Sequence, residues 1–320
     1  MSERRRAPVV TILRNAATAQ IFRELPDNYD IAFAGAENAP DRQRLRNTEV
    51  LIVALTRVDA ALLDLMPKLR LVQNFGVGLD LLDLQALRAR GIQVANTRGY
   101  NADVVAEHAM MLLLVLSRGF VKPYLDLKQR GEWRGSGPWS WELKGKRLGI
   151  LGYGHVGRAL ARKARCFDMT VEVWNRSGAA RSSRDGIAWL SLDELLASTD
   201  ALCITAPLTA QTRALIGREA LARMKPGAVL VNVGRGPIVD QEALIEAVRT
   251  GRLRGAGLDV TDPEPLPPDH PLLSVDNIVV TPHCAGVSSD TRARGRAMVY
   301  DNIERFARGE PVRNRVEPAG

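Results

Sequence analysis

The stretch ILGYGHVGRALARKARCFDMTVEVWNRS, residues 150–177, decides how this chain folds. Gly152, Gly154 and Gly157 form the pattern G-x-G-x-x-G between a short apolar run and a helical run. In such a βα unit the first glycine permits a tight turn, the second lets a diphosphate approach the backbone, and the third lets helix and strand pack closely. The pattern alone also fits a plain glycine-rich turn. The strand before it and the helix after it favour dinucleotide binding at the helix N-terminus.

The next strand of this unit, TVEVW, ends in Asn175, Arg176 and Ser177. An Asp or Glu at this point would bind the adenosine ribose of NAD and repel an added 2′-phosphate. Asn175 removes that repulsion, Arg176 can pair with the phosphate, and Ser177 can donate a further hydrogen bond. The trio predicts NADP as the preferred cofactor. NAD remains the alternative if this is only a polar turn with its arginine in solvent.

Outward from this stretch, β-rich runs alternate with helical runs in two series. Such alternation is typical of parallel sheets covered by helices. We therefore predict an α/β fold with two doubly wound, Rossmann-like parallel sheets, the second with the rhythm of a full Rossmann sheet. The first series comprises 9–13, 31–33, 50–55, 71–75 and 92–96, and the second comprises 147–152, 170–174, 201–205, 228–233, 255–260 and 277–282.

Two helices are predicted to join the series. One is almost wholly apolar, covers 101–119 and is capped by Asn101 or Asp103. The other is capped by Ser289 and ended by Gly309. The tail after Gly309 can then return to the first unit. The expected substrate domain comprises residues 1–100 and 287–320, and the dinucleotide-binding domain inserted into it comprises residues 101–286.

The composition excludes several classes of protein. At 320 residues and 46% hydrophobic content, the chain can bury two ordinary cores. The net charge of +8 favours small anionic ligands, but the arginines are scattered, so nucleic acid is not an expected partner. No signal peptide is recognised, and the apolar run at 109–116 is shorter than the roughly 18 residues of a membrane span, so no membrane partner is expected. Three scattered cysteines predict neither disulfides nor a metal site, and fit the cytoplasm.

Five segments sharpen the prediction. They are NFGVGLD (74–80), LKGKRLGILGYGHVGRAL (143–160), VNVGRGPIVD (231–240), GAGLDVTDPEP (255–265) and TPHCAG (281–286). With them the chain resembles the D-isomer-specific 2-hydroxyacid dehydrogenase family over nearly its whole length. The resemblance implies a flavodoxin-like substrate domain, an active cleft between the domains, and hydride transfer between NAD(P)H and C2 of a small 2-keto or 2-hydroxy acid. It also implies a homodimer, with the segment 125–141 reaching the partner.

Reduction of a 2-keto acid requires a cation for the carboxylate and a proton donor for the carbonyl oxygen. Arg235 follows a strand in a glycine-flanked turn, and its planar fork suits a carboxylate, although a surface salt bridge is the alternative. The resemblance makes Arg235 the substrate clamp and His283, one of four histidines, the general acid and base. It makes Glu264 the carboxylate partner of His283. The alternative for Glu264 is a solvated loop acid.

The resemblance also implies the remaining contacts. Backbone N–H groups of Val77 and Gly78 would hold the substrate carboxylate together with Arg235 and His283. The expected cofactor contacts are Gly152, Tyr153, Gly154, His155, Val156, Gly157, Asn175, Arg176, Ser177, Thr205, Ala206, Pro207, Val233, Gly234, Arg235, Asp259, His283 and Gly286.

Other functions stay open at this stage. A formate dehydrogenase would pair the histidine with an amide, so Glu264 argues against it. Phosphite oxidation would use the same three residues, and a nucleotide-sensing corepressor would share the fold. A thiol nucleophile at Cys284 is disfavoured by its expected orientation away from His283. Glyoxylate and hydroxypyruvate are the first candidate substrates, because similar enzymes with an arginine in the cofactor turn often reduce them.

Overall fold

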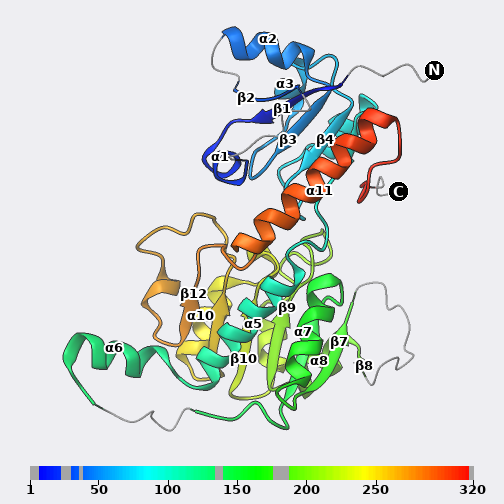
Figure 1. Cartoon of the computed structure of the whole chain (residues 1–320). Coiled ribbons are helices and arrows are strands. Elements are labelled where there is room, and N and C mark those ends of the chain that lie inside the picture. Colours follow the sequence, from blue (N-terminus) through cyan, green and yellow to red (C-terminus); the bar gives the residue numbers. More distant parts are fainter. Residues whose placement is uncertain (1–6, 23–29, 36–38, 134–139, 176–186, 317–320) are drawn as a thin grey trace. The chain divides into compact units, whose positions relative to one another are not determined.

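The computed structural model describes residues 7–22, 30–35, 39–133, 140–175 and 187–316 (Figure 1). The chain divides into two compact units. The first comprises Met1–Tyr100 with Ser288–Gly320, and the second comprises Asn101–Val287.

The first unit contains a five-stranded sheet in the order β2-β1-β3-β4-β5, with every pair of neighbours parallel. This strand order is that of flavodoxin-like folds. Buried apolar residues in these strands form two cores: Val10, Ile12 and Ile52 belong to one, and Leu13, Leu51 and Val53 belong to the other. The elements are β1 (Val9–Leu13), α1 (Ala16–Ile21), β2 (Asp30–Ala34), α2 (Ala39–Asn47), β3 (Val50–Val53), α3 (Ala60–Asp64), β4 (Leu71–Asn74), α4 (Leu84–Ala89), β5 (Gln93–Ala95) and α11 (Ser289–Arg308).

The second unit contains a seven-stranded parallel sheet in the order β12-β11-β10-β9-β6-β7-β8. The order reverses between β6 and β9, which is the point where Rossmann sheets bind their ligands. The elements are α5 (Ala102–Ser117), α6 (Val121–Arg130), β6 (Arg147–Leu151), α7 (His155–Arg165), β7 (Thr170–Trp174), β8 (Ala188–Trp189), α8 (Leu192–Ser198), β9 (Ala201–Ile204), α9 (Arg218–Arg223), β10 (Ala228–Asn232), α10 (Gln241–Arg249), β11 (Leu253–Leu258) and β12 (Ile278–Val280), with short 3₁₀ helices at Gly236–Ile238 and Pro271–Ser274.

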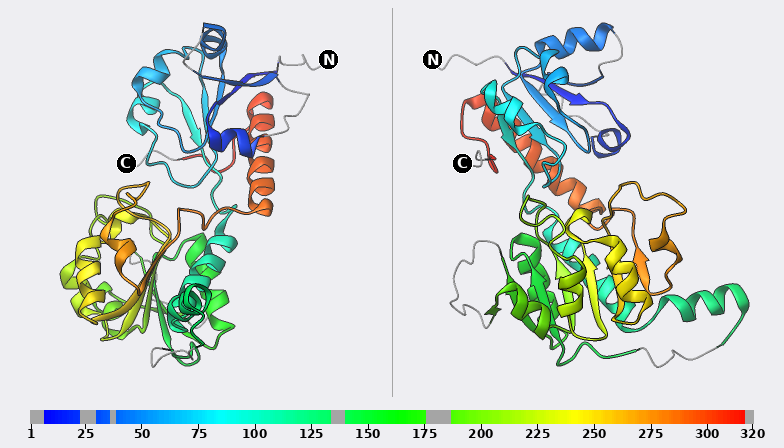
Figure 2. Two further views of the ribbon diagram at one scale, coloured as in Figure 1. Left: turned by 90° about the vertical axis from the view of Figure 1, so that its left-hand side faces the viewer. Right: turned by 180° about the vertical axis from the view of Figure 1, so that it is seen from behind.

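The strands of the second unit alternate their side chains between two cores. Leu202 and Ile204 of β9 pack with α8, α9 and α10, whereas Ala201 and Cys203 pack with α5 and α7. This alternation follows from the period of two in a strand. Figure 2 shows the yellow helices and the green helices on opposite sides of this sheet. Both faces are therefore buried, as is typical of parallel sheets.

The structure corrects three details of the predicted elements. β8 was not predicted, because Ala188–Trp189 is too short for a periodic signal. The last helix is capped by Ser288 rather than Ser289, and Ser288 shares a capping box with Thr291. Asn101 is the N-cap of α5, but its side chain makes no capping hydrogen bond. Within the described ranges no single helix is long and apolar enough to cross a membrane, and the joined pair α5 and α6 passes that test only across a bend of 71°.

Candidate active site

The glycine pattern forms a tight turn between β6 and α7. Gly152 has a φ of 104°, and a Cβ there would lie 2.6 Å from the backbone nitrogen of Ala206. A Cβ on Gly157 would lie 2.3 Å from the carbonyl oxygen of Gly152, so helix and strand are in contact at this point. Gly154, the N-cap of α7, has open space around its Cβ position. The first turn of α7 contains no acidic residue, which suits an anion at its N-terminus.

The strands beside this turn bring further expected residues to it. Thr205 Oγ1 donates to the carbonyl oxygen of Gly152 at 2.5 Å. A Cβ on Gly234, after β10, would lie 2.8 Å from the carbonyl oxygen of Ala206. Gly152, Thr205 and Gly234 therefore follow three neighbouring strands, β6, β9 and β10, at one edge of the sheet. Of the other expected residues there, His155 and Val156 form the first turn of α7, and Pro207 and Val233 directly follow Ala206 and Asn232.

The residues expected to select the cofactor are only partly described. Asn175 directly follows β7 and is half-buried. Arg176 and Ser177 lie outside the described residues. Tyr153 packs its ring edge-on against Trp189 of β8, with the two centroids 5.4 Å apart. An aromatic pair therefore flanks the turn on the side of β7 and β8.

Arg235 lies in a turn that a buried asparagine holds. The side chain of Asn232 donates to the carbonyl oxygen of Arg235 at 3.0 Å and accepts from the N–H of Gly234 at 3.0 Å. A Cβ on Gly236 would lie 1.9 Å from the carbonyl oxygen of Thr261, so the backbone of this turn touches the backbone that leads to Glu264. The close approach fixes the Arg235 turn against the Glu264 loop.

His283 and Glu264 form a direct pair. His283 Nδ1 lies 2.7 Å from Glu264 Oε2, and Glu264 Oε1 accepts from the N–H of Thr261 at 2.9 Å. An ionised carboxylate only accepts hydrogen bonds, so Nδ1 is the protonated nitrogen of the ring. The other nitrogen, Nε2, is then left for exchange with a ligand. The predicted strand 277–282 would place His283 directly after its end, but β12 stops at Val280, so His283, with a φ of 50°, lies in the turn that follows.

The electrostatics of the pair favour a charged histidine. The pKa of His283 is raised, chiefly by the hydrogen bond to Glu264 and also by that carboxylate's charge, against the opposing effects of burial and of Arg235. Burial raises the pKa of Glu264, but hydrogen bonds from His283 and from the Thr261 N–H outweigh it, so the net shift is downward. Because the charge of Arg235 acts on both groups, the three expected catalytic residues occupy one site within the second unit.

Asp259 supports the turn that carries His283. Its buried carboxylate accepts hydrogen bonds from the N–H groups of Cys284 at 3.0 Å and Ala285 at 2.9 Å, and from the hydroxyl of Thr281 at 2.6 Å. Its own carbonyl accepts from the N–H of His283 at 2.9 Å. Sequence reasoning expected Asp259 only as a cofactor contact and did not find this supporting arrangement.

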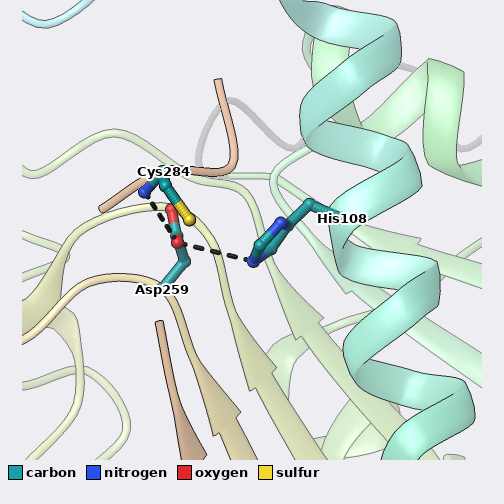
Figure 3. A group of neighbouring side chains, drawn as sticks. All are labelled: His108, Asp259 and Cys284. Carbon is teal, nitrogen blue, oxygen red and sulfur yellow. Dashed lines mark hydrogen bonds and ion pairs between the residues drawn. The ribbon is translucent and has the colours of Figure 1, made fainter. Parts of the chain in front are cut away.

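His108 and Cys284 complete the group around Asp259 (Figure 3). Ligand atoms of these three residues lie within 4.8 Å of one another. The hydroxyl of Thr281 donates to Asp259 and so accepts from His108 Nε2, which is 2.9 Å away. Burial, and then the charge of Asp259, raises the pKa of the Cys284 thiol, which disfavours a thiolate nucleophile. The hydrogen bonds of Asp259 to Thr281 and to the Cys284 N–H, and that of His108 to Thr281, give this cluster a role in supporting the His283 turn.

Three expected residues remain, which are Gly286, Val77 and Gly78. Gly286 packs against Asn101, whose amide nitrogen would be 2.6 Å from an added Cβ. Val77 and Gly78 belong to the first unit and follow β4 in a turn.

Comparison with known proteins identifies the family. The sequence profile described as "D-isomer specific 2-hydroxyacid dehydrogenase, NAD binding domain" matches residues 110–285. The chain belongs to the D-isomer-specific 2-hydroxyacid dehydrogenase family. It is therefore an NAD(P)-dependent 2-hydroxyacid dehydrogenase, and the predicted fold and enzyme class are confirmed.

Individual relatives agree with this assignment. The chain is 40% identical to glyoxylate/hydroxypyruvate reductase B of Yersinia pestis (strain Pestoides F) over 318 residues, which cover 96% of this chain and 97% of the relative. It is 37% identical to the glyoxylate reductase of Korarchaeum cryptofilum (strain OPF8) over 276 residues, or 84% and 82% of the two chains. The solved structure of the TT0316 protein from Thermus thermophilus is 34% identical, with a TM-score of 0.84 and coverage of 96% and 99%.

Proposed function

We propose that this chain is an NADPH-preferring reductase of short 2-keto acids, with glyoxylate and hydroxypyruvate as its first candidate substrates. The observation that carries the proposal is the pair of His283 and Glu264, 2.7 Å apart, within the field of Arg235. The names of the relatives, which are glyoxylate and hydroxypyruvate reductases, support the choice of substrates. The positive net charge of +8 suits small anionic substrates.

Each of the three residues has one task in this reaction. When bound, the cofactor supplies the hydride to C2 of the keto acid. Arg235 holds the substrate carboxylate with its planar fork, and the backbone N–H groups of Val77 and Gly78 are proposed to hold it as well. His283 donates the proton on Nε2 to the carbonyl oxygen, which becomes the hydroxyl of the product. Glu264 keeps His283 protonated and fixes the orientation of its ring.

The residues of the glycine turn fit a dinucleotide. The open space at Gly154 and the N-terminus of α7, which has no acidic residue, suit a diphosphate. Gly152, Tyr153, Gly154, His155, Val156 and Gly157 are proposed to hold it, with Thr205, Ala206, Pro207, Val233 and Gly234 along the neighbouring strand ends. The preference for NADPH rests on the sequence of Asn175, Arg176 and Ser177.

A panel of 2-keto acids, each assayed with NADPH and NADH, tests the proposal. We expect glyoxylate or hydroxypyruvate to give the highest kcat/KM, and kcat/KM to favour NADPH by about tenfold, or 1.4 kcal/mol. Arg176→Ala should remove most of that preference, while Arg249→Ala, which changes an exposed arginine in the last turn of α10, serves as the control. Equal or better use of NADH by the unmodified protein would contradict the cofactor preference.

A second copy of the chain is the proposed protein partner. α6 extends away from the sheet of its unit in Figure 1 and exposes Tyr124, Leu125 and Leu127, with Phe120 stacked on Tyr124 at 5.4 Å. Exposed apolar groups of this kind mark interaction sites, and two-fold dimers are the commonest assemblies. We expect light scattering to give the mass of a dimer, and Leu127→Glu to give a monomer. The free cysteines of the described chain support a cytoplasmic location.

A further inference from the structure

Two buried asparagines hold the turn that follows β4. The side-chain nitrogen of Asn74 donates to the carbonyl oxygens of Gly76 at 3.2 Å and Gly78 at 2.8 Å. The side-chain nitrogen of Asn96 donates to the carbonyl oxygen of Val77 at 2.9 Å. Three consecutive carbonyl groups therefore point at amide donors inside the unit.

The parallel sheet explains why these two side chains meet at one turn. In the register of β4 and β5, Gln73 pairs with Ala95, so Asn74 and Asn96 are the next residues at the carboxyl ends of neighbouring strands. Both are buried, at 7% and 2% exposure. Asn96 Oδ1 accepts from the N–H of Arg98 at 3.2 Å, which fixes its amide with the nitrogen towards Val77.

The consequence is a turn that directs two of its N–H groups away from these supports. Thr97 Oγ1 accepts from the N–H of Gly76 at 2.9 Å, whereas the N–H groups of Val77 and Gly78 have no acceptor among the residues that the structure describes. Successive backbone N–H groups in a turn can bind an anion. Because the supports are neutral, they add no negative charge that would repel a carboxylate.

We propose that Asn74 and Asn96 are positioning residues for binding the substrate carboxylate. They fix the carbonyl groups of Gly76, Val77 and Gly78 inward and so hold the N–H groups of Val77 and Gly78 in the orientation that receives the carboxylate. This inference rests on the proposed function, in which those N–H groups contact the substrate. Asn74 and Asn96 act through the turn and do not touch the substrate themselves.

The test compares a charged and an uncharged substrate in Asn74→Ala and Asn96→Ala. The two substrates are the best 2-keto acid of the panel and its carboxamide, which keeps the carbonyl group and lacks the negative charge. We expect the KM for the keto acid to rise about tenfold, because a poorly oriented turn would lose about one hydrogen bond to the substrate carboxylate. The kcat should change by less than about threefold. The ratio of kcat/KM for acid over amide should fall about tenfold, and the KM for NADPH should not change.

Asn302→Ala is the matched control. Asn302 is a buried asparagine of the same unit, and its side-chain nitrogen donates to Gln73 Oε1 at 2.7 Å and to the carbonyl oxygen of Arg313 at 3.0 Å. Its removal should lower the thermal unfolding temperature as much as the other two substitutions while leaving the acid-to-amide ratio unchanged. A merely structural role for Asn74 and Asn96 would give all three variants the same ratio.

The outcomes separate this inference from the function on which it rests. If the unmodified protein turns over no 2-keto acid, the proposed function falls and this inference falls with it. If it does turn over a keto acid, an unchanged ratio in both variants, or an equal fall in Asn302→Ala, overturns this inference alone. Should Asn96→Ala not fold, Asn74→Ala decides the matter, because it removes two of the three amide hydrogen bonds.

Discussion

The turn at 74–80 in the first unit and the turn at 281–286 in the second both follow strands of parallel sheets, but opposite hydrogen-bonding groups hold them. In the first, neutral amides of Asn74 and Asn96 donate to backbone carbonyls. In the second, the carboxylate of Asp259 accepts from backbone N–H groups. The first arrangement turns N–H groups outward without adding charge. The pKa of His283 is raised chiefly by its hydrogen bond to Glu264, and the negative charge of Asp259 in the second turn acts in the same direction. Each support therefore carries a charge that suits its turn. Neutral amides lie beside the proposed carboxylate site, and a carboxylate lies beside the histidine that must be protonated.

His283→Ala tests the second turn most directly. We expect kcat for keto-acid reduction to fall at least about 100-fold, because no other group would deliver the proton to the carbonyl oxygen. Steady-state kinetics on the best keto acid measure it, and the circular dichroism spectrum should stay native. His270→Ala is the matched control, because that histidine only caps the short helix at Pro271–Ser274. Near-native kcat in His283→Ala would contradict the assigned role.

Asp259→Asn removes the negative charge of the side chain that holds the 281–286 turn and keeps the shape of that side chain. The amide NH₂ group would meet the N–H of Cys284 or Ala285, so one buried donor would lose its acceptor. We expect the free energy of unfolding to fall by about 1–3 kcal/mol. Chemical denaturation measures it, with the exposed Asp193→Asn as control, for which only a small change is expected. Unchanged stability in Asp259→Asn would show that the carboxylate does not hold the turn.

Glu264→Gln tests the effect of the carboxylate charge on His283 without altering the Asp259 support of the turn that carries it. Because Glu264 raises the pKa of His283, reduction, which needs protonated His283, should persist to higher pH in the unmodified protein than in the variant. The variant should lose reduction, and gain oxidation of the hydroxy acid, at lower pH than the unmodified protein. Profiles of kcat/KM against pH in both directions measure the shift. Superimposable profiles for the two proteins would rule out the pairing as the source of the shift.

The same pair links pH to stability. The raised pKa of His283 contributes stability that is fully present below its ordinary pKa and is lost as pH rises through the folded-state pKa. The lowered pKa of Glu264 contributes stability that is present above its ordinary pKa and is lost as pH falls through the folded-state value. The pair therefore stabilises the fold most at pH values above the ordinary pKa of Glu264 and below the ordinary pKa of His283.

Ser288→Ala should have the smallest effect. Ser288 caps α11 just after the 281–286 turn, and its loss should cost about 1 kcal/mol of stability. Thermal unfolding measures the loss, while kcat should stay unchanged because Ser288 supports the helix and not the histidine turn. A large fall in kcat would mean that the 281–286 turn, which carries His283, depends on the cap of α11.

Much of this arrangement could be predicted from the sequence. Alternating apolar runs and the glycine pattern predicted both sheets, and the family resemblance pointed to Arg235, Glu264 and His283. The support of the 281–286 turn was missed because some of its contacts are distant in sequence: Thr281 and His108 are 173 residues apart. A signal was present all the same. Asn74, Asn96 and Asn232 each lie at or directly after the carboxyl end of a mostly apolar strand, where a buried amide is costly unless it is hydrogen-bonded.

The close approach of Gly236 to Thr261 limits how this enzyme can be redesigned. A side chain at position 236 has no room beside the Thr261 carbonyl, so a mutant library at this position should yield glycine alone among active clones. The loops at 233–240 and 261–265 fit each other by backbone shape. Chimeras that exchange one of these loops between relatives should fail, whereas chimeras that exchange both together should retain turnover.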